Sequence, residues 1–208
     1  MALEEVFVEI DYLLLSDEGH DLMRQCVIDL KNIAAGSLIH KKLDLQEERE
    51  INGLAFNAGC TSTVVLITAD TIYCANAGDS RACIATKKGK VIELSYDHKP
   101  DNEGELKRVK AAGGFVEDGR VQGVIAVSRA IGDWEYKNPK LLAEMDGKKR
   151  KSLKKKKGEA EVESPGIKLG NYPGAGKIYR NIEESKKHQV TSFPDIIKVP
   201  FKADYDFL

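Results

Sequence analysis

Residues 61–94 alternate between β-branched stretches and short turn signals, and this alternation limits the chain to folds that contain an antiparallel sheet. Four stretches are predicted strands: residues 63–68, 71–77, 81–86 and 91–94. Ala69-Asp70 is typical of a tight turn, and 87–90 of a hairpin turn. Because each turn is short, neighbouring strands are expected to pair in chain order. The pattern therefore predicts an antiparallel meander.

Helices are predicted on both sides of this region. Residues 2–15 place apolar side chains at three- and four-residue steps, which is typical of an amphipathic helix, and a second such helix is expected to end near 35–36. A third is predicted over 103–112, where Asp101 or Asn102 could accept hydrogen bonds from the first free amides and Gly113 could end the helix. A further strand is predicted over 121–127. Grouped helices and antiparallel strands indicate an α+β fold.

Composition is that of one globular domain: 208 residues, 42% hydrophobic, with a formal net charge of -1. The apolar runs are far shorter than the roughly 20 residues needed to cross a bilayer, and no signal-peptide pattern opens the chain. We therefore expect no membrane span and an intracellular, monomeric protein. The four cysteines lack metal-site spacing and are expected to be buried free thiols.

Positive charges are concentrated within residues 148–157, which form a basic run. Its cations are Lys148, Lys149, Arg150, Lys151, Lys154, Lys155, Lys156 and Lys157. The run could be a solvated loop, a nuclear-localisation signal or a patch that binds phosphorylated partners or other polyanions. A nuclear or a cytoplasmic location would both fit it. No aromatic residue is interleaved with the lysines, which argues against single-stranded nucleic acid as a partner, and anionic lipid remains a third alternative.

Four short motifs follow one another along the chain. They are Gly59-Cys60-Thr61-Ser62-Thr63, Gly78-Asp79-Ser80-Arg81-Ala82, Asp97-His98-Lys99-Pro100 and Ser128-Arg129-Ala130-Ile131-Gly132-Asp133. In this order, with strand-like sequence between them, they resemble the metal-dependent type 2C protein phosphatases, the PPM family.

The resemblance implies a fold and an activity. The fold is a four-layer α-β-β-α sandwich with antiparallel central sheets. The activity is hydrolysis of phosphoserine and phosphothreonine in proteins by a water that two Mg²⁺ or Mn²⁺ ions activate. It also implies that residues 1–208 are a partial domain, truncated at both ends, with a lysine-rich flap insertion over about 137–188.

The paired-metal ligands of the family are not found in this sequence. Asp118-Gly119 shares a dipeptide with one of them, but it falls in a predicted turn. We therefore expect the 208-residue chain alone to be catalytically inactive and poorly soluble. An inactive pseudophosphatase that binds phosphoproteins as a scaffold is the alternative function.

The resemblance assigns Asp79 to a third, weaker metal site. The alternative is that Asp79 is a turn residue whose side chain forms a hydrogen bond with its own backbone. Gly78 suits a tight turn in either case. Ser80 and Arg81 complete this motif as structural support.

Asp97 and His98 have the residue types of a metal or acid–base pair, yet neighbours on an extended chain point in opposite directions. We predict structural roles for both, with Asp97 accepting backbone amides before the helix. By resemblance, Arg129, Gly132 and Asp133 support the loop beneath the active edge. Thr61 and Ser62 have no histidine at a motif-like position to activate them, so strand packing is expected.

Overall fold

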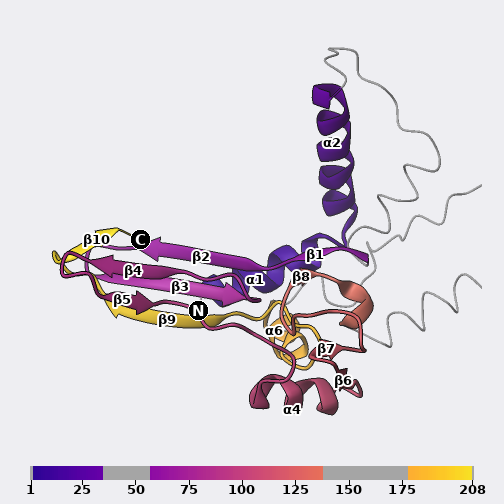
Figure 1. Cartoon of the computed structure of the whole chain (residues 1–208). Helices are drawn as coiled ribbons and strands as arrows, with labels where there is room; N and C mark the ends of the chain where they lie inside the picture. The colour runs from indigo at the N-terminus through magenta and orange to yellow at the C-terminus, as the bar shows by residue number, and fades with distance from the viewer. Residues whose placement is uncertain (1, 35–56, 138–177, 208) are drawn as a thin grey trace, which may run out of the picture.

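The computed structural model describes residues 2–34, 57–137 and 178–207, which form helices and antiparallel strands (Figure 1). The basic run over 148–157 lies outside these residues, so its predicted roles stay predictions.

The first sheet has the strand order β2-β3-β9. Its strands are β2 (Ser62–Ile67), β3 (Thr71–Ala77) and β9 (Asp195–Pro200). The predicted hairpin between β2 and β3 is confirmed, and β9 pairs antiparallel with β3 from a distance of more than a hundred residues along the chain. Local sequence therefore determines two of the three strands of this sheet, and a distant segment supplies the third.

The second sheet has the order β10-β4-β5. Its strands are β10 (Tyr205–Phe207), β4 (Cys83–Thr86) and β5 (Val91–Glu93). The predicted meander is wrong at one point, because β3 and β4 belong to different sheets. The chain crosses between the sheets at Gly78, whose φ of 120° is unfavourable for a residue with a side chain. A Cβ there would also lie 2.3 Å from Cγ2 of Thr61.

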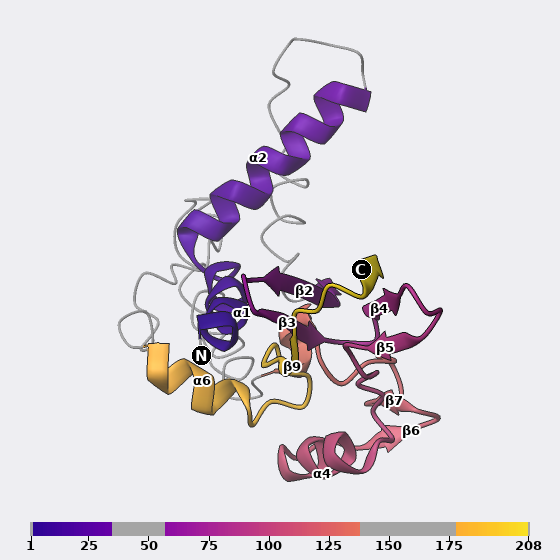
Figure 2. The same ribbon diagram turned by 90° about the vertical axis from the view of Figure 1, so that its left-hand side faces the viewer.

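The two sheets enclose the main apolar core. Alternate side chains of β3 and β4 bury Ile72, Cys74 and Ile84 against Leu94. The predicted burial of the cysteines is correct for Cys74 but wrong for the other three, which are exposed. Helix α1 (Ala2–Leu13) covers the opposite face of the first sheet, where Phe7 packs on the β3 alanines. The predicted α+β sandwich with antiparallel central sheets is confirmed (Figures 1 and 2).

Helix α4 (Glu103–Ala111) forms where a helix was predicted, but its Val109 packs with Val121 and Val190 at the end of the sandwich. The predicted cap needs correction, because the Asn102 side chain makes no cap hydrogen bond to the helix and donates to the Asp97 carbonyl instead, at 2.8 Å. Gly113, with a φ of 80°, ends the helix as predicted.

Strands β6 (Val116–Glu117) and β7 (Arg120–Val121) form a short hairpin. Its turn is Asp118-Gly119, as predicted, and both residues have positive φ, as such two-residue turns require. The predicted strand over 121–127 is wrong. A second pair of positive φ angles, at Gln122 and Gly123, reverses the chain and leaves only an isolated bridge from Val121 to Ile125.

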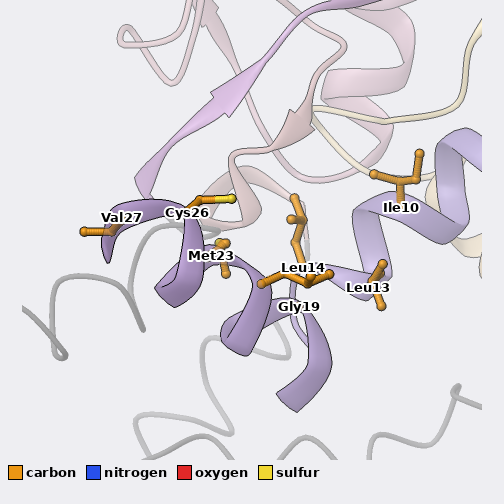
Figure 3. Close-up of a pocket in the computed structure, with 8 residues that line it drawn as sticks. Ile10, Leu13, Leu14, Gly19, Met23, Cys26 and Val27 are labelled. Carbon is orange, nitrogen blue, oxygen red and sulfur yellow. The ribbon is translucent and has the colours of Figure 1, made fainter. Parts of the chain in front are cut away.

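Helix α2 (Asp17–Ala34) confirms the second predicted helix but projects away from the sheets (Figures 1 and 2). Several of its apolar side chains face solvent, and Ile33 is 76% exposed. A cavity of about 310 Å³ lies at the junction of α1 and α2. Figure 3 shows side chains that line it. Its lining is apolar: Ile10, Leu13, Leu14, Gly19, Leu22, Met23, Cys26 and Val27. None of the helices in the described ranges is long and apolar enough to span a membrane.

The predicted surface insertion over 137–188 needs correction at its two ends, because those residues pack into the domain. Lys137 is fully buried, and helix α6 (Ile178–Ser185) packs against α1. Ser185 and His188 are buried as well, and the Ser185 carbonyl accepts a hydrogen bond from the Thr191 hydroxyl at 2.6 Å. Residues 138–177 lie outside the described ranges.

His188 gives the fold a pH dependence. Its ring packs edge-on against Trp134, and within the described structure neither ring nitrogen has a hydrogen-bond partner. Burial, reinforced by the positive charges of Lys137 and Arg108, lowers the pKa of His188 from 6.5 to about 3. The unfolded chain therefore takes up this proton first, so the contribution of a neutral His188 is complete above pH 6.5 and is lost as the pH falls towards 3.

We expect the free energy of unfolding to fall by up to about 1.4 kcal/mol per pH unit below 6.5 because of this residue. Urea titrations at pH 7, 6 and 5 measure the change. The variant His188→Gln, which cannot take up a proton in this range, should show a shallower dependence. Equal shifts of the urea midpoint in both proteins would contradict the prediction.

Candidate functional site

Two of the predicted motifs lie side by side where the chain crosses between the sheets. The Gly78 amide donates to Nδ1 of His98 at 3.0 Å, and the His98 amide donates to the Gly78 carbonyl at 3.0 Å. These reciprocal hydrogen bonds bind the 78–82 segment to the 97–100 segment. Sequence alone could not show this pairing, because the strands β4 and β5 separate the two motifs.

Two ion pairs also join these two segments. The Arg81 guanidinium binds the Asp97 carboxylate with two hydrogen bonds of 2.7 and 2.9 Å, and Nζ of Lys99 lies 2.5 Å from Oδ2 of Asp79. Hydrogen bonding to Arg81 lowers the pKa of the Asp97 carboxyl. The predicted partner of Asp97 was wrong, because its carboxylate binds this guanidinium rather than backbone amides. A structural role for Asp97 stays a prediction.

His98 is buried and points away from the Asp97 carboxylate, as the alternation of an extended chain predicts. Its Nδ1 accepts the Gly78 amide, so Nε2 carries the ring proton and donates to Oδ2 of Asp195 at 3.1 Å. This hydrogen bond lowers the pKa of the Asp195 carboxyl. His98 thus links the first residue of β9 to the crossing between the sheets.

Arg129 connects the fourth motif, residues 128–133, to the same network. Its guanidinium contacts Glu105 of α4 at 2.7 Å and Oδ1 of Asp195 at 2.6 Å, and it also donates to the Phe193 carbonyl. Burial alone would raise the pKa of Glu105, but hydrogen bonds from Arg129 and Arg108 outweigh it and lower that pKa to about 2. The Arg129 side chain therefore joins α4 to β9.

Gly132 and Asp133 lie on a different side of the site. Strand β8 (Ile131–Gly132) pairs with β1 (Gly59–Cys60), and a Cβ on Gly132 would lie 2.4 Å from the Ala58 carbonyl oxygen. Asp133 has a φ of 50°, its amide donates to the same carbonyl, and burial raises the pKa of its carboxyl. Among the described contacts, none joins Asp133 to Asp79.

The Thr61 hydroxyl lies 2.7 Å from the Ser80 hydroxyl, which joins the first motif to the second. Thr63 adds a hydrogen bond to Asn76 on β3 at 2.6 Å. Threonine hydroxyls in this region therefore make strand and turn contacts, as the packing interpretation predicted.

Sequence reasoning missed four charged residues that hold these segments together: Asp11, Glu105, Lys137 and Asp195. Asp11 and Lys137 form an ion pair of 2.7 Å with no exposed side-chain surface. Asp11 offered a signal, because it shares the buried face of α1 with Phe7 and Val8. Lys137 offered none, since a lysine at the edge of a basic region is usually solvated.

The described residues do not by themselves fit the divalent ions that the resemblance implies. Over 2–34, 57–137 and 178–207, no group of three or more His, Cys, Asp or Glu side chains is arranged to hold a metal ion. Asp79, the predicted ligand, has an ammonium group against its carboxylate instead. Its contacts are those of an ion-pair partner.

Two curated proteins that are similar to this chain are named as phosphatases. "Probable protein phosphatase 2C 6" of Paramecium tetraurelia is 43% identical over 136 residues, 65% of this chain and 38% of the relative. "Protein phosphatase 2C homolog 3" of Schizosaccharomyces pombe is 58% identical over 87 residues, 42% of this chain and 21% of the relative. The chain thus spans less than half the length of these relatives.

A solved structure, a serine-threonine phosphatase 2C from Toxoplasma gondii, is 18% identical, with a TM-score of 0.43 over 89% of this chain and 48% of that one. At this TM-score the likeness adds nothing to the sequence match. The family model described as protein phosphatase 2C matches residues 18–208, nearly the whole chain. This chain belongs to the protein phosphatase 2C family.

Proposed function

We propose that this chain serves as part of a metal-dependent phosphatase that removes phosphate from phosphoserine and phosphothreonine in proteins. The observation that carries the proposal is the family match over residues 18–208. The site supports it, because the 78–82, 97–100 and 128–133 motifs of the resemblance, far apart in sequence, join one network through His98, Asp195 and Arg129.

The role of the described residues in such an enzyme would be to position a loop. His98 holds both the amide and the carbonyl of Gly78, and Arg129 holds the Asp195 carboxylate against His98. Each contact limits the movement of the segment that carries Asp79. A rigid loop of this kind reduces the reorganisation needed when a charged substrate binds.

A phosphoprotein-binding scaffold without hydrolysis is the second candidate. It is favoured by the pairing of the acidic side chains at the site with cations: Asp79 with Lys99, Asp97 with Arg81, and Glu105 with Arg108 and Arg129. Carboxylates engaged in this way are less available as metal ligands.

We expect purified residues 1–208 to release no phosphate from a phosphothreonine peptide, even with millimolar Mn²⁺, because the described residues do not assemble a metal site. Phosphate release is measured by a colorimetric assay with and without EDTA. Release that depends on Mn²⁺ and stops with EDTA would contradict the expected inactivity of this chain and support phosphatase function directly.

The proposed function itself is tested on the protein from its natural source. An antibody against this chain isolates it, its intact mass is compared with 23.0 kDa, and Mn²⁺-dependent phosphatase activity is assayed on the beads. Activity supports the phosphatase. A protein that retains a phosphopeptide but releases no phosphate would instead support the scaffold.

A further inference from the structure

We propose that this chain forms a two-fold dimer in which helix α2 of each copy packs on the first sheet of the other copy. The two surfaces are an apolar stripe on α2 and the part of the sheet that α1 leaves uncovered. The inference concerns association of the chain with itself and does not depend on phosphatase activity. It replaces the monomer that the sequence led us to expect.

The stripe on α2 consists of exposed apolar side chains on one side of the helix. Leu22, Leu30 and Ile33 are 54%, 66% and 76% exposed, and Cys26 is exposed as well. At about 100° per residue, these positions lie within about 80° of one another around the helix. Leu22 and Cys26 also line the cavity at the junction with α1, so the apolar surface continues into it. Such a stripe is typical of a helix face that packs against another surface.

The turn between α1 and α2 fixes the direction of α2. The Ser16 hydroxyl donates to the Leu13 carbonyl at 2.7 Å and accepts the Gly19 amide at 3.0 Å. Leu15 and His20 are buried at this turn, and a Cβ on Gly19 would clash with the Leu13 carbonyl oxygen. Because α2 projects away from the sheets, it could reach its own sheet only by breaking these contacts (Figures 1 and 2). A second copy can cover the stripe without any such change.

The receiving surface is the outer face of the first sheet, which α1 covers only in part. Leu66 of β2 pairs with Tyr73 of β3, and Tyr73 pairs with Lys198 of β9, so these three side chains form a row on one face. The next row contains Val64 and Ala75, and α1 packs on Ala75. Val64 and Leu66 remain 41% and 47% exposed. In a dimer, the stripe of one copy and this face of the other can therefore cover each other.

Charge complementarity favours the sheet as the surface that receives α2. Glu18 and Asp29 border the stripe, because each lies four residues before one of its members. The row on the sheet ends at Lys198, whose ammonium lies 5.6 Å from the centroid of the Tyr73 ring. The acidic border of α2 can therefore face a cation. Two α2 helices packed antiparallel on each other would instead bring their acidic borders together, which is unfavourable.

Sedimentation equilibrium of the purified 208-residue chain measures the association. We expect a species of twice 23.0 kDa, with a dissociation constant that rises at least about tenfold in Leu30→Ser and in Leu66→Ser, because each contact occurs twice in a two-fold dimer. Val91→Ser is the matched control, since Val91 is also 66% exposed but lies on β5 of the second sheet. This control should associate like the parent chain. Circular dichroism spectra confirm that the variants are folded.

Mixing two charged variants separates this dimer from other arrangements. Leu30→Asp has a damaged stripe and an intact sheet, and Leu66→Lys has the reverse, so each alone should stay monomeric at concentrations where the parent chain is dimeric. Their mixture should form heterodimers, because one contact then joins the intact stripe to the intact sheet. A parent chain that is monomeric at all concentrations would overturn the proposal. So would a dimer that either serine variant leaves unchanged, or a mixture without heterodimers.

Discussion

Asp11→Asn should lower the free energy of unfolding by about 3–5 kcal/mol, because it leaves the buried Lys137 without its counter-charge. Neither side chain has exposed surface, and Nζ of Lys137 lies 2.7 Å from both Asp11 oxygens and from the Ala130 carbonyl. Three acceptors match the three protons of an ammonium group. Burial raises the pKa of Asp11 and lowers that of Lys137, whereas the attraction and hydrogen bonds between the two groups shift each pKa in the opposite direction.

Asparagine has nearly the same shape as aspartate but no charge, so this substitution measures the effect of the lost charge alone. Its amide oxygen can still accept the Gly132 amide, which donates to Oδ1 of Asp11 at 2.7 Å in the parent chain. Its NH₂ group, however, faces the Lys137 ammonium, so two donors oppose each other without an acceptor. The lost free energy of unfolding therefore reports on the ion pair rather than on the packing of α1.

Urea denaturation at pH 7 measures this effect as a shift of the midpoint at constant slope. Asp21→Asn is the control, because Asp21 is 74% exposed in its pair with Arg24 and should change stability by less than about 0.5 kcal/mol. The double variant Asp11→Asn/Lys137→Met should recover much of the loss by removing the unpaired charge. If the double variant is as unstable as Asp11→Asn, the ion-pair explanation is wrong.

Glu105→Gln is expected to cost about 3 kcal/mol at pH 7, because Arg108 and Arg129 would then face each other without a carboxylate between them. Glu105 is 8% exposed, and both arginines contact it at 2.7 Å. The Ser128 hydroxyl donates to it as well. Its replacement also removes the contact between Arg129 and α4, so we expect the ion pair between Arg129 and Asp195 to weaken.

The pH dependence gives this prediction a second readout. The folded pKa of Glu105 is about 2, below its ordinary value of 4.5, so its stabilisation is complete above pH 4.5 and is lost as the pH falls through 2. This difference corresponds to about 3 kcal/mol at neutral pH. Glu105→Gln should therefore lose less stability than the parent chain between pH 4.5 and 2.

Denaturation at pH 7, 4.5 and 3 tests both parts. Glu103→Gln serves as the control on the same helix, because Glu103 is 84% exposed in its pair with Lys107 and should behave like the parent chain. If Glu105→Gln loses as much stability as the parent chain between pH 4.5 and 3, other carboxylates cause the acid sensitivity of this fold.

Local patterns predicted the elements that depend on local contacts. Helices α1 and α2 follow from the spacing of their apolar residues, and the β2–β3 hairpin from β-branched runs on both sides of Ala69-Asp70. The same logic failed at 121–127, where Gln122 and Gly123 adopt positive φ and end the strand. Positive φ at a glutamine has no signal in residue type.

Among the candidate site residues, sequence reasoning correctly separated Asp97 from His98 but could not find their partners. Asp97 binds Arg81 from an earlier strand boundary, and His98 binds Asp195 from the far end of the chain. Such partners depend on which segments the sheets bring together, so residue spacing cannot identify them.

The sequence by itself determined the α+β class, the β2–β3 hairpin and the family, because these depend on periodicity, turn chemistry and short motifs. Only the tertiary structure decided that β3 and β4 part into two sheets at Gly78 and that Asp79 meets Lys99. It also decided that Asp11 and Lys137 are buried together. The physical reason is that burial and charge pairing depend on contacts between distant segments, which exist only after the sheets and helices have packed.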